Sequence, residues 1–540
     1  MAGSRSAADD RIFALALVVV ALLALALRAP VAGLPFERDE GEYAYIAQRW
    51  FEGDVPYRDA FDQKPPGIFV FYAAAFAAFG ESEAAVRWTA QLWALVGIAA
   101  IAVLGARIAT PAAGVAAAIA AVACAAQPGW LNNAVNTEQV AVTPLALGGV
   151  AALALATRSG IEPSFAVGAL GSLALLLKPV TLPIVAYQIG TALWLGRRRR
   201  VAHAVAAALG LGIPLAATAS WFAAHGAWRE LVDALLWNNL DYASRVALSD
   251  YPTVFAMGVT PSLAALAPIY ASVLAAPLAL LRSLPSHVAV RPLLWVAGWL
   301  VVSLVAVSAG GYFRHHYFAL ALPPLAVLAG IGLDAFARWA LASRRYARWA
   351  GAGLALALLG WTVVSDWWYF GPAPAGAKLQ RLYGANAFPE APQLGAWIAA
   401  NSEPTDRFFV YGSEPQLFFY ANRPSASRYI FVYPLTMPLP AAAERQREAL
   451  ADFDAARPLF VVATFAFGSI LEQPGTPPEL KTGLRERLGR DYDLTAVVPY
   501  FEDRSTQILL GDRARAIWEA QPLWDGATPW AAYVVWKRRD

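Results

Sequence analysis

The residues best suited to chemistry lie in the stretch that follows the first apolar segment of the chain. Asp39 and Glu40 stand next to each other there, and Lys64 stands directly before Pro65 and Pro66. An ionised carboxylate can take a proton from a hydroxyl group, and a cation can stabilise the charge of a phosphate group. The two prolines stiffen the backbone beside Lys64. This stretch therefore predicts an acid/base group and a phosphate-binding cation at the same depth relative to the membrane.

Asp39 has two interpretations that the sequence leaves open. As a general base it needs no unusual pKa, since an ordinary aspartate is ionised at neutral pH. Alternatively, it caps a helix or pairs with Arg38. Residues 43–51 place apolar and aromatic side chains, Tyr43 among them, at helical spacing. This spacing predicts an amphipathic helix along a membrane surface, with Asp39 and Glu40 at its start and directed toward the membrane segments.

Further polar residues lie at the ends of other apolar segments. Arg314 and His316 precede a segment with paired prolines, and they either bind a phosphate group or belong to an interfacial belt. Lys178 lies at the tip of a short hairpin, where it either binds phosphate or extends toward the membrane surface. Glu138 either contributes to a metal or sugar site or belongs to a polar turn.

A metal site has candidate ligands but no settled set. Zinc needs several closely placed His or acidic side chains, and the chain has only five His. The candidates for a substrate or metal contact are Asp62, Tyr43, Glu138 and His315, with His225 and His316 as further possible ligands. A divalent metal ion therefore stays open as a cofactor, and its identity is unknown from the sequence.

The composition places these residues in a membrane protein. The chain is 58% hydrophobic and 15% charged, with a mean hydropathy of +0.45, whereas soluble domains are roughly a quarter charged. The net charge of +3 gives no indication of a nucleic-acid partner. The chain has a single cysteine, Cys124, which lies in an apolar run. With one cysteine, no intrachain disulfide can form.

The apolar segments predict a bundle of about eleven membrane-spanning helices, since each crossing needs about 20 mostly apolar residues. The predicted segments are 12–27, 86–104, 112–126, 140–156, 165–177, 180–195, 201–223, 254–281, 293–309, 317–341 and 350–364.

Basic residues predict the orientation of this bundle. They fall in alternate loops, and an excess of Arg and Lys marks the cytoplasmic side. The N-terminus is therefore expected inside and the C-terminus outside, and the run Arg197–Arg200 is read as a topology anchor. The other basic residues of this set are Arg5, Arg11, Arg107, Arg158, Arg282, Arg291, Arg338, Arg344, Arg345 and Arg348.

The predicted organisation is an all-α membrane domain, residues 1–365, followed by an extracytoplasmic α/β domain, residues 366–540. The first outer loop, residues 30–85, carries the catalytic candidates. In the second domain, strand-like runs at 408–411, 429–433, 459–463 and 532–536 alternate with helical patterns, which predicts a mainly parallel sheet. The turn Gly412-Ser413-Glu414 either covers the site or is an ordinary strand-to-helix turn.

The Asp39-Glu40 pair, Tyr43 and the Lys64-Pro65-Pro66 motif together resemble the signature of the GT-C type membrane glycosyltransferases. That superfamily includes the protein O-mannosyltransferases and the lipid A aminoarabinose transferases, and the resemblance covers nearly the whole membrane part. One position departs from the pattern: the lipid A transferases have Glu directly before the Lys, where this chain has Gln63. A metal-binding role of that Glu is therefore in doubt here, although Asp62 is adjacent.

The resemblance implies an inverting glycosyltransferase, a hexosyl- or pentosyltransferase of cell-envelope glycan biosynthesis. Its donor would be a polyprenyl-phosphate sugar and its acceptor a lipid, glycan or protein. Asp39 would be the general base, and Lys64 would bind the carrier phosphate. The resemblance also implies a multi-pass protein of the bacterial inner membrane that acts on the extracytoplasmic face, among membrane lipids.

Two other classes of function remain as alternatives. A flippase or transporter of lipid-linked sugars would show inverted repeats and polar residues at mid-membrane, whereas the polar residues here gather at one face. An O-antigen ligase-like enzyme usually places its key loop late between spans, rather than directly after the first.

Overall fold

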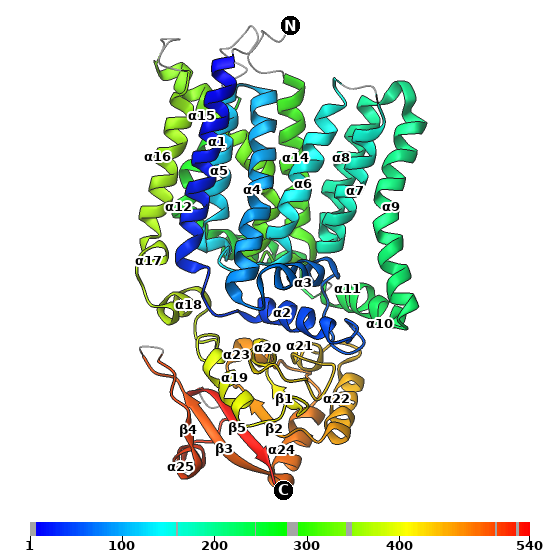
Figure 1. Cartoon of the computed structure of the whole chain (residues 1–540), viewed down its shortest axis with the longest axis vertical. Helices are drawn as coiled ribbons and strands as arrows, with labels where there is room; N and C mark the ends of the chain where they lie inside the picture. Colours follow the sequence, from blue (N-terminus) through cyan, green and yellow to red (C-terminus); the bar gives the residue numbers. More distant parts are fainter. Residues whose placement is uncertain are drawn as a thin grey trace.

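The computed structural model describes residues 7–157, 160–243, 245–277, 290–341, 348–502, 505–524 and 529–539. A long helical bundle stands above a smaller mixed domain, and the described N-terminal and C-terminal ends lie at opposite ends of the molecule (Figure 1). Of the residues used above, Arg5, Arg158, Arg282, Arg344 and Arg345 lie outside the described residues, as does the end of the predicted segment 254–281.

The bundle is built from helices of 14 to 26 residues. Its helices are α1 (Ala7–Arg28), α4 (Glu83–Ile108), α5 (Pro111–Ala125), α6 (Thr137–Ala154), α7 (Glu162–Leu177), α8 (Leu182–Leu195), α9 (Arg200–Ala224), α12 (Tyr251–Ala275), α14 (Val290–Ser308), α15 (Leu322–Leu341) and α16 (Ala350–Ser365).

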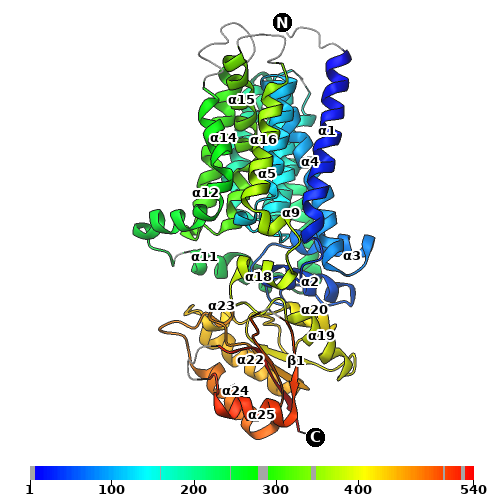
Figure 2. The same ribbon diagram turned by 90° about the vertical axis from the view of Figure 1, so that its left-hand side faces the viewer.

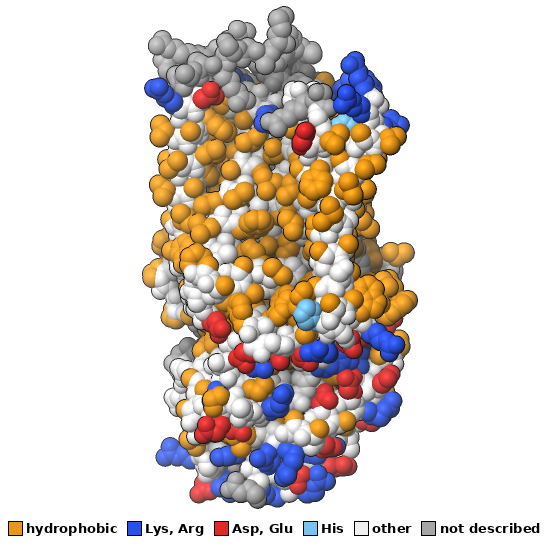
Figure 3. Space-filling view, turned by 45° about the vertical axis from the view of Figure 1, so that its right-hand side comes forward, with side chains coloured by type: hydrophobic (Ala, Val, Ile, Leu, Met, Phe, Trp, Pro, Cys, Tyr) orange, Lys and Arg blue, Asp and Glu red, His pale blue; other side chains and the backbone are white. Residues whose placement is uncertain are grey.

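Each predicted membrane segment falls on one of these helices. Within the described residues, seven helical stretches are long and apolar enough to cross a membrane, and shorter apolar helices accompany them. The space-filling view shows hydrophobic side chains along the bundle and charged side chains over the C-terminal domain (Figure 3). The chain is therefore a multi-pass membrane protein, while the number of crossings and their orientation stay predictions.

The first outer loop forms two helices that lie across the lower end of the bundle, α2 (Arg38–Phe51) and α3 (Gly67–Phe79) (Figures 1 and 2). The amphipathic helix expected at 43–51 is confirmed as a helix, but its apolar face does not lie on an open membrane surface. Residues 40–48 are buried, because α2 packs between α3 and the short helix α20 (Gln416–Ala421). The contact is tight: a Cβ atom on Gly41 would lie 2.5 Å from the backbone nitrogen of Gln416.

The remaining short elements lie between bundle helices or, in the case of α17 and α18, lead from the bundle to the lower domain. They are α10 (Trp228–Val232), the π-helical turn Asp233–Trp237, α11 (Asn238–Ala243), α17 (Trp367–Phe370) and α18 (Ala375–Tyr383), with single 3-10 turns at Ala29–Val31, Pro128–Trp130, Pro179–Thr181, Arg197–Arg199, Leu248–Asp250, Ala309–Gly311 and His315–Ala321.

The C-terminal domain has a five-stranded sheet in the order β1-β2-β5-β3-β4. The strands are β1 (Phe408–Tyr411), β2 (Phe460–Ala463), β3 (Tyr492–Pro499), β4 (Leu509–Leu510) and β5 (Ala531–Arg538). The helices besides α20 are α19 (Ala391–Ala400), α21 (Tyr433–Thr436), α22 (Ala442–Ala456), α23 (Phe467–Ile470), α24 (Glu479–Asp491) and α25 (Gly511–Ala520).

The expectation of a mainly parallel sheet is wrong. Among the described strands, β1 and β2 alone pair in parallel, and the other three pairings are antiparallel. The apolar run at 429–433 is no strand, because its side chains pack against the first outer loop. The ring of Phe61 lies 5.6 Å from that of Tyr429 and 6.3 Å from that of Phe431. The run at 429–433 is apolar because it packs against another part of the chain, and its sequence pattern is the same as that of a buried strand.

Candidate functional site

A cavity of about 840 Å³ lies between the lower end of the bundle and the C-terminal domain. The first outer loop contributes Asp39 and Lys64 to its wall, and the bundle contributes Lys178, Arg314 and two histidines, His315 and His316. The C-terminal domain closes it with uncharged side chains such as Tyr433. Six of the ten predicted site residues therefore meet in one cavity.

Asp39 faces this cavity from the first turn of α2. Its side chain keeps 26% of its exposure, and one oxygen lies 3.8 Å from the Lys64 ammonium group. Burial alone would raise the pKa of Asp39, but the charges of Lys64, His316 and Lys178 outweigh it and lower that pKa. The carboxylate is thus ionised at neutral pH and accessible, as a general base requires.

Both alternative roles of Asp39 are wrong. The N-cap of α2 is Glu37, whose side chain accepts a hydrogen bond from the Glu40 backbone in a capping box. Arg38 pairs instead with Glu414 of the C-terminal domain, at 3.3 Å. Asp39 has neither structural task, which leaves its side chain available to a substrate.

Lys64 lies among three carboxylates. Its ammonium group is 3.4 Å from Glu42 and 3.8 Å from each of Asp39 and Asp62. Burial alone would lower the pKa of Lys64, but Asp39 and Glu42 raise it well above its ordinary value. Lys64 is therefore a fixed cation, and Glu42 is a site residue that sequence reasoning missed.

Close backbone packing brings Lys64 toward the hairpin that carries Lys178. A Cβ atom on Gly67 would lie 2.5 Å from the Leu176 carbonyl oxygen, so only glycine allows this approach. Lys178 itself lies 2.8 Å from Glu138, and its ammonium group lies 4.6 Å above the ring of Tyr317. The segments on either side of the two lysines are thus held together by glycine packing.

Glu138 and Lys178 form a buried ion pair, with side-chain exposures of 1% and 12%. His316 Nε2 lies 3.9 Å from the same Glu138 oxygen. This geometry excludes the reading of Glu138 as an ordinary polar turn. It also excludes the reading of Lys178 as a side chain that extends away to the membrane surface.

Arg314 lines the cavity without a carboxylate at ion-pair distance among the described residues, and its guanidinium lies 5.7 Å from the centre of the Tyr312 ring. The backbone beside it is strained: Phe313 has a φ of 42°, and Leu131 and Leu471 in the same cavity wall have φ of 54° and 50°. Such conformations cluster at functional sites. Arg314 is exposed, and an exposed arginine without an acid at ion-pair distance is suited to bind an anion from outside the chain.

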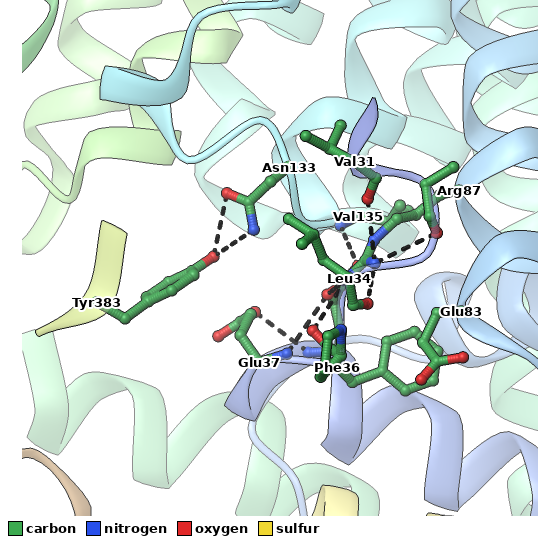
Figure 4. A network of polar contacts seen from close by, with 12 residues as sticks. Val31, Leu34, Phe36, Glu37, Glu83, Arg87, Asn133, Val135 and Tyr383 are labelled. Atoms are coloured by element: carbon green, nitrogen blue, oxygen red, sulfur yellow. Dashed lines mark hydrogen bonds and ion pairs between the residues drawn. The ribbon is translucent and has the colours of Figure 1, made fainter. Parts of the chain in front are cut away.

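Glu40 does not belong to this cavity, which corrects its placement beside Asp39 as a catalytic group. Its carboxylate is fully buried, forms an ion pair with Arg87 of α4, and accepts a hydrogen bond of 3.0 Å from the Val135 backbone. Figure 4 shows Arg87 beside Val31 and Leu34, whose carbonyl oxygens also accept its hydrogen bonds. Successive residues of a helix point in different directions, which separates Glu40 from Asp39.

The remaining candidates support the site from behind. Asp62 is fully buried and accepts a hydrogen bond of 3.0 Å from the Lys64 backbone. Tyr43 is fully buried, with the Lys64 ammonium group 5.4 Å from its ring centre. His315 lines the cavity, and its Nδ1 lies 3.0 Å from the Gly258 carbonyl oxygen.

The sequence left a divalent metal ion open as a cofactor. Among the described residues no group of three or more His, Cys, Asp or Glu side chains could hold one. The three carboxylates at Lys64 already surround an ammonium group, and His225 is exposed and stacked on Trp221. A divalent metal ion therefore stays an untested prediction, and no step of the reaction below depends on it.

Two further cavity residues were missed in the sequence. Glu37 stands three residues before Glu40, which is the spacing of a capping box, and this signal could have been found. Burial raises the pKa of Glu37 to about 8, and the neighbouring charges of Asp39 and Glu40 add to the rise. Arg245, from the loop after α11, donates to the Pro438 carbonyl oxygen and has no comparable sequence signal.

Comparison with known proteins supports the resemblance predicted from the first loop. Residues 63–223, which include Lys64, Glu138 and Lys178, match the model of the dolichyl-phosphate-mannose-protein mannosyltransferase family. No curated protein sequence matches the chain.

The fold has solved relatives. ArnT from Cupriavidus metallidurans, bound to undecaprenyl phosphate, aligns with a TM-score of 0.58 and 17% identity over 91% of this chain and 97% of its own. Its apo structure aligns with the same score and identity over 93% and 98%. An oligosaccharyltransferase of Archaeoglobus fulgidus aligns more loosely, with a TM-score of 0.49 and 13% identity over 92% and 73%. The chain therefore has the ArnT fold.

Proposed function

We propose that this chain, which has the ArnT fold and shares a segment with the mannosyltransferase family, is a glycosyltransferase with a polyprenyl-phosphate sugar as donor. The observation that carries the proposal is the distance of 3.8 Å between Asp39 and Lys64 in a cavity that Lys178 and Arg314 also line. One accessible carboxylate thus lies beside several cations, as a transfer from a phosphate to a hydroxyl group requires.

The reaction is a single displacement with inversion at the sugar. The acceptor oxygen attacks the anomeric carbon while the bond from that carbon to the phosphate oxygen breaks. Asp39 takes the proton of the acceptor hydroxyl, and the electron pair of the broken bond stays on the carrier phosphate. Lys64, Lys178 and Arg314 stabilise the charge that develops there, since fixed cations in a partly enclosed cavity need no rearrangement during the reaction.

The choice of donor rests on two observations. ArnT has been solved with undecaprenyl phosphate, and this chain shares its fold. In addition, Arg314, Lys64 and Lys178 line the cavity between the bundle and the C-terminal domain, where the phosphate of a membrane-embedded lipid would lie. The acceptor would be a hydroxyl group of a lipid, glycan or protein that enters between the bundle and the C-terminal domain.

The proposed location is the bacterial inner membrane, with the cavity and the C-terminal domain outside the cytoplasm. The alternating basic loops favour this orientation. Described arginines such as Arg107, Arg198 and Arg338 lie at the ends of α4, α8 and α15 that are far from the cavity. A donor that has crossed the membrane would then meet its acceptor on the outer face.

The decisive experiment measures transfer of radiolabelled sugar by the purified protein from a panel of polyprenyl-phosphate sugars to mixed envelope acceptors. We expect labelled product from at least one donor, with release of polyprenyl phosphate, and product formation that is roughly 10²–10⁴-fold slower with Asp39→Asn. A flippase would instead move donor between the leaflets of a vesicle without releasing polyprenyl phosphate. Donor movement without any transfer, equal in wild type and Asp39→Asn, would refute the proposed function.

A further inference from the structure

Arg38 stands directly before Asp39, and the side-chain hydrogen bonds of Arg38 go to the C-terminal domain and the segment leading to it. Its guanidinium donates to the Ser413 carbonyl oxygen at 2.5 Å, to Asn386 at 3.1 Å and to Glu414 at 3.3 Å. It also lies 5.2 Å from the centre of the Tyr433 ring. The planar fork of arginine can satisfy several acceptors at once, which a lysine cannot do.

The acceptors of Arg38 are themselves held in place. Glu414 is fully buried, and its second oxygen accepts a hydrogen bond of 2.6 Å from the Ser469 hydroxyl group. The same hydroxyl oxygen accepts a hydrogen bond of 2.8 Å from the Ser413 backbone. The turn after β1, which accepts hydrogen bonds from Arg38, is thus fixed to the segment after β2.

A second contact stops α2 from turning about this anchor. Gly41 packs directly on Gln416, where a Cβ atom would lie 2.5 Å from the backbone. Arg38 and Gly41 are three residues apart and so lie on neighbouring positions of one helix face. The C-terminal domain therefore fixes the first turn of α2 at two points on either side of Asp39.

We propose that Arg38 is a positioning residue through which the C-terminal domain holds Asp39 at the productive distance from the acceptor. The inference rests on the proposed function, since it assigns Asp39 the role of base. It makes the domain a required part of the active site rather than only a cover over it. Small displacements matter for such a base: a shift of about 1 Å can cost roughly 100-fold in rate.

The experiment compares Arg38→Gln, Arg38→Lys, Glu414→Gln and Ser469→Ala in the full-length protein. We expect kcat to fall by about 10- to 100-fold in Arg38→Gln and Glu414→Gln, and less in Ser469→Ala, while donor affinity stays at the wild-type value. Asp454→Asn is the matched control, since it removes an ion pair with Arg487 that lies within the C-terminal domain. Wild-type kcat in Glu414→Gln, or an equal loss of kcat and donor affinity, would overturn the proposal.

A second readout separates positioning from a merely structural role and does not depend on transfer. The pH midpoint of carbodiimide labelling of Asp39 reports its ionisation, on which the charges of Lys64, His316, Lys178 and Arg38 act. Arg38→Gln removes one positive charge, so the midpoint should move to higher pH, whereas Arg38→Lys should keep it near wild type. An unchanged midpoint in Arg38→Gln would contradict the positioning proposal, whether or not the wild-type protein transfers sugar. A wild-type protein that transfers no sugar would refute only the proposed function.

Discussion

Glu40 and Arg87 form an ion pair in which both side chains are fully buried. The pair joins the first turn of α2 to α4 of the bundle, while Arg38 joins the same turn to the C-terminal domain. The helix that carries Asp39 is therefore held from above and from below.

Glu40→Gln tests the structural role of this ion pair. The change leaves the Arg87 charge buried without its partner, which should destabilise the protein by about 3–5 kcal/mol. Denaturant unfolding in detergent measures this loss. The donor affinity of the protein that remains folded should stay near wild type, since Glu40 does not line the cavity. A stable Glu40→Gln protein with greatly reduced turnover would contradict this structural role and would favour a catalytic role for Glu40.

Asp39→Asn tests the general base. Asparagine keeps the size of the side chain but cannot take the proton of the acceptor, so turnover should fall by roughly 10²–10⁴. Donor binding and thermal stability should change little, because Asp39 is neither the N-cap of α2 nor a partner of Arg38. Steady-state transfer and equilibrium donor binding measure the two quantities. Wild-type turnover of well-folded Asp39→Asn would falsify the assignment.

Lys64→Ala tests the phosphate-binding cation and the pKa of Asp39 together. Loss of a charged hydrogen bond should weaken donor binding by about 1.5–3 kcal/mol, and Lys64→Arg should restore part of it. Because Lys64 lowers the pKa of Asp39, its removal should move the acid limb of the pH–rate profile to higher pH.

Arg314→Ala is the matched variant for Lys64→Ala. Arg314 lines the same cavity but is not among the four charges that act most strongly on the pKa of Asp39. It should therefore weaken donor binding without moving the acid limb. Equal shifts of the acid limb in the two variants would show that the limb does not report Asp39.

Glu37 predicts a specific pH dependence of stability. Its pKa in the folded protein is about 8, above the ordinary 4.5, so the folded state binds the proton more tightly than the unfolded state. Its contribution is therefore complete below about pH 4.5 and is lost as the pH rises through 8. The unfolding midpoint in detergent should fall over this window, and Glu37→Gln should flatten the fall. An identical slope in wild type and Glu37→Gln would contradict this assignment.

The orientation can be tested with fused reporters. A periplasmic reporter joined after Asp540 should be active outside the cytoplasm, and a cytoplasmic one joined after Arg200 should be active inside, since basic loops stay inside. A C-terminal domain found in the cytoplasm would leave the cavity on the wrong face for the proposed donor and would remove the enzyme model.

The sequence by itself determined the elements whose signals are local. Each long apolar run became a bundle helix, because an unpaired backbone group in hydrocarbon is so costly that composition and length decide the structure. The chemistry of Asp39 and Lys64 could also be predicted, since an acid and a proline-flanked cation after the first span need no partner to be recognised. Arg314, Lys178 and His316 were found through their positions at the ends of apolar segments.

Only the tertiary structure separated Asp39 from Glu40. Both are acids in one helical turn, and they differ in what surrounds them. Glu40 pairs with Arg87, 47 residues further along the chain, whereas Asp39 lines the cavity. The role of Glu414 and the failure of the run at 429–433 to form a strand have the same cause. Packing between segments tens to hundreds of residues apart decides which polar groups are paired and which face a cavity, and no local pattern records that pairing.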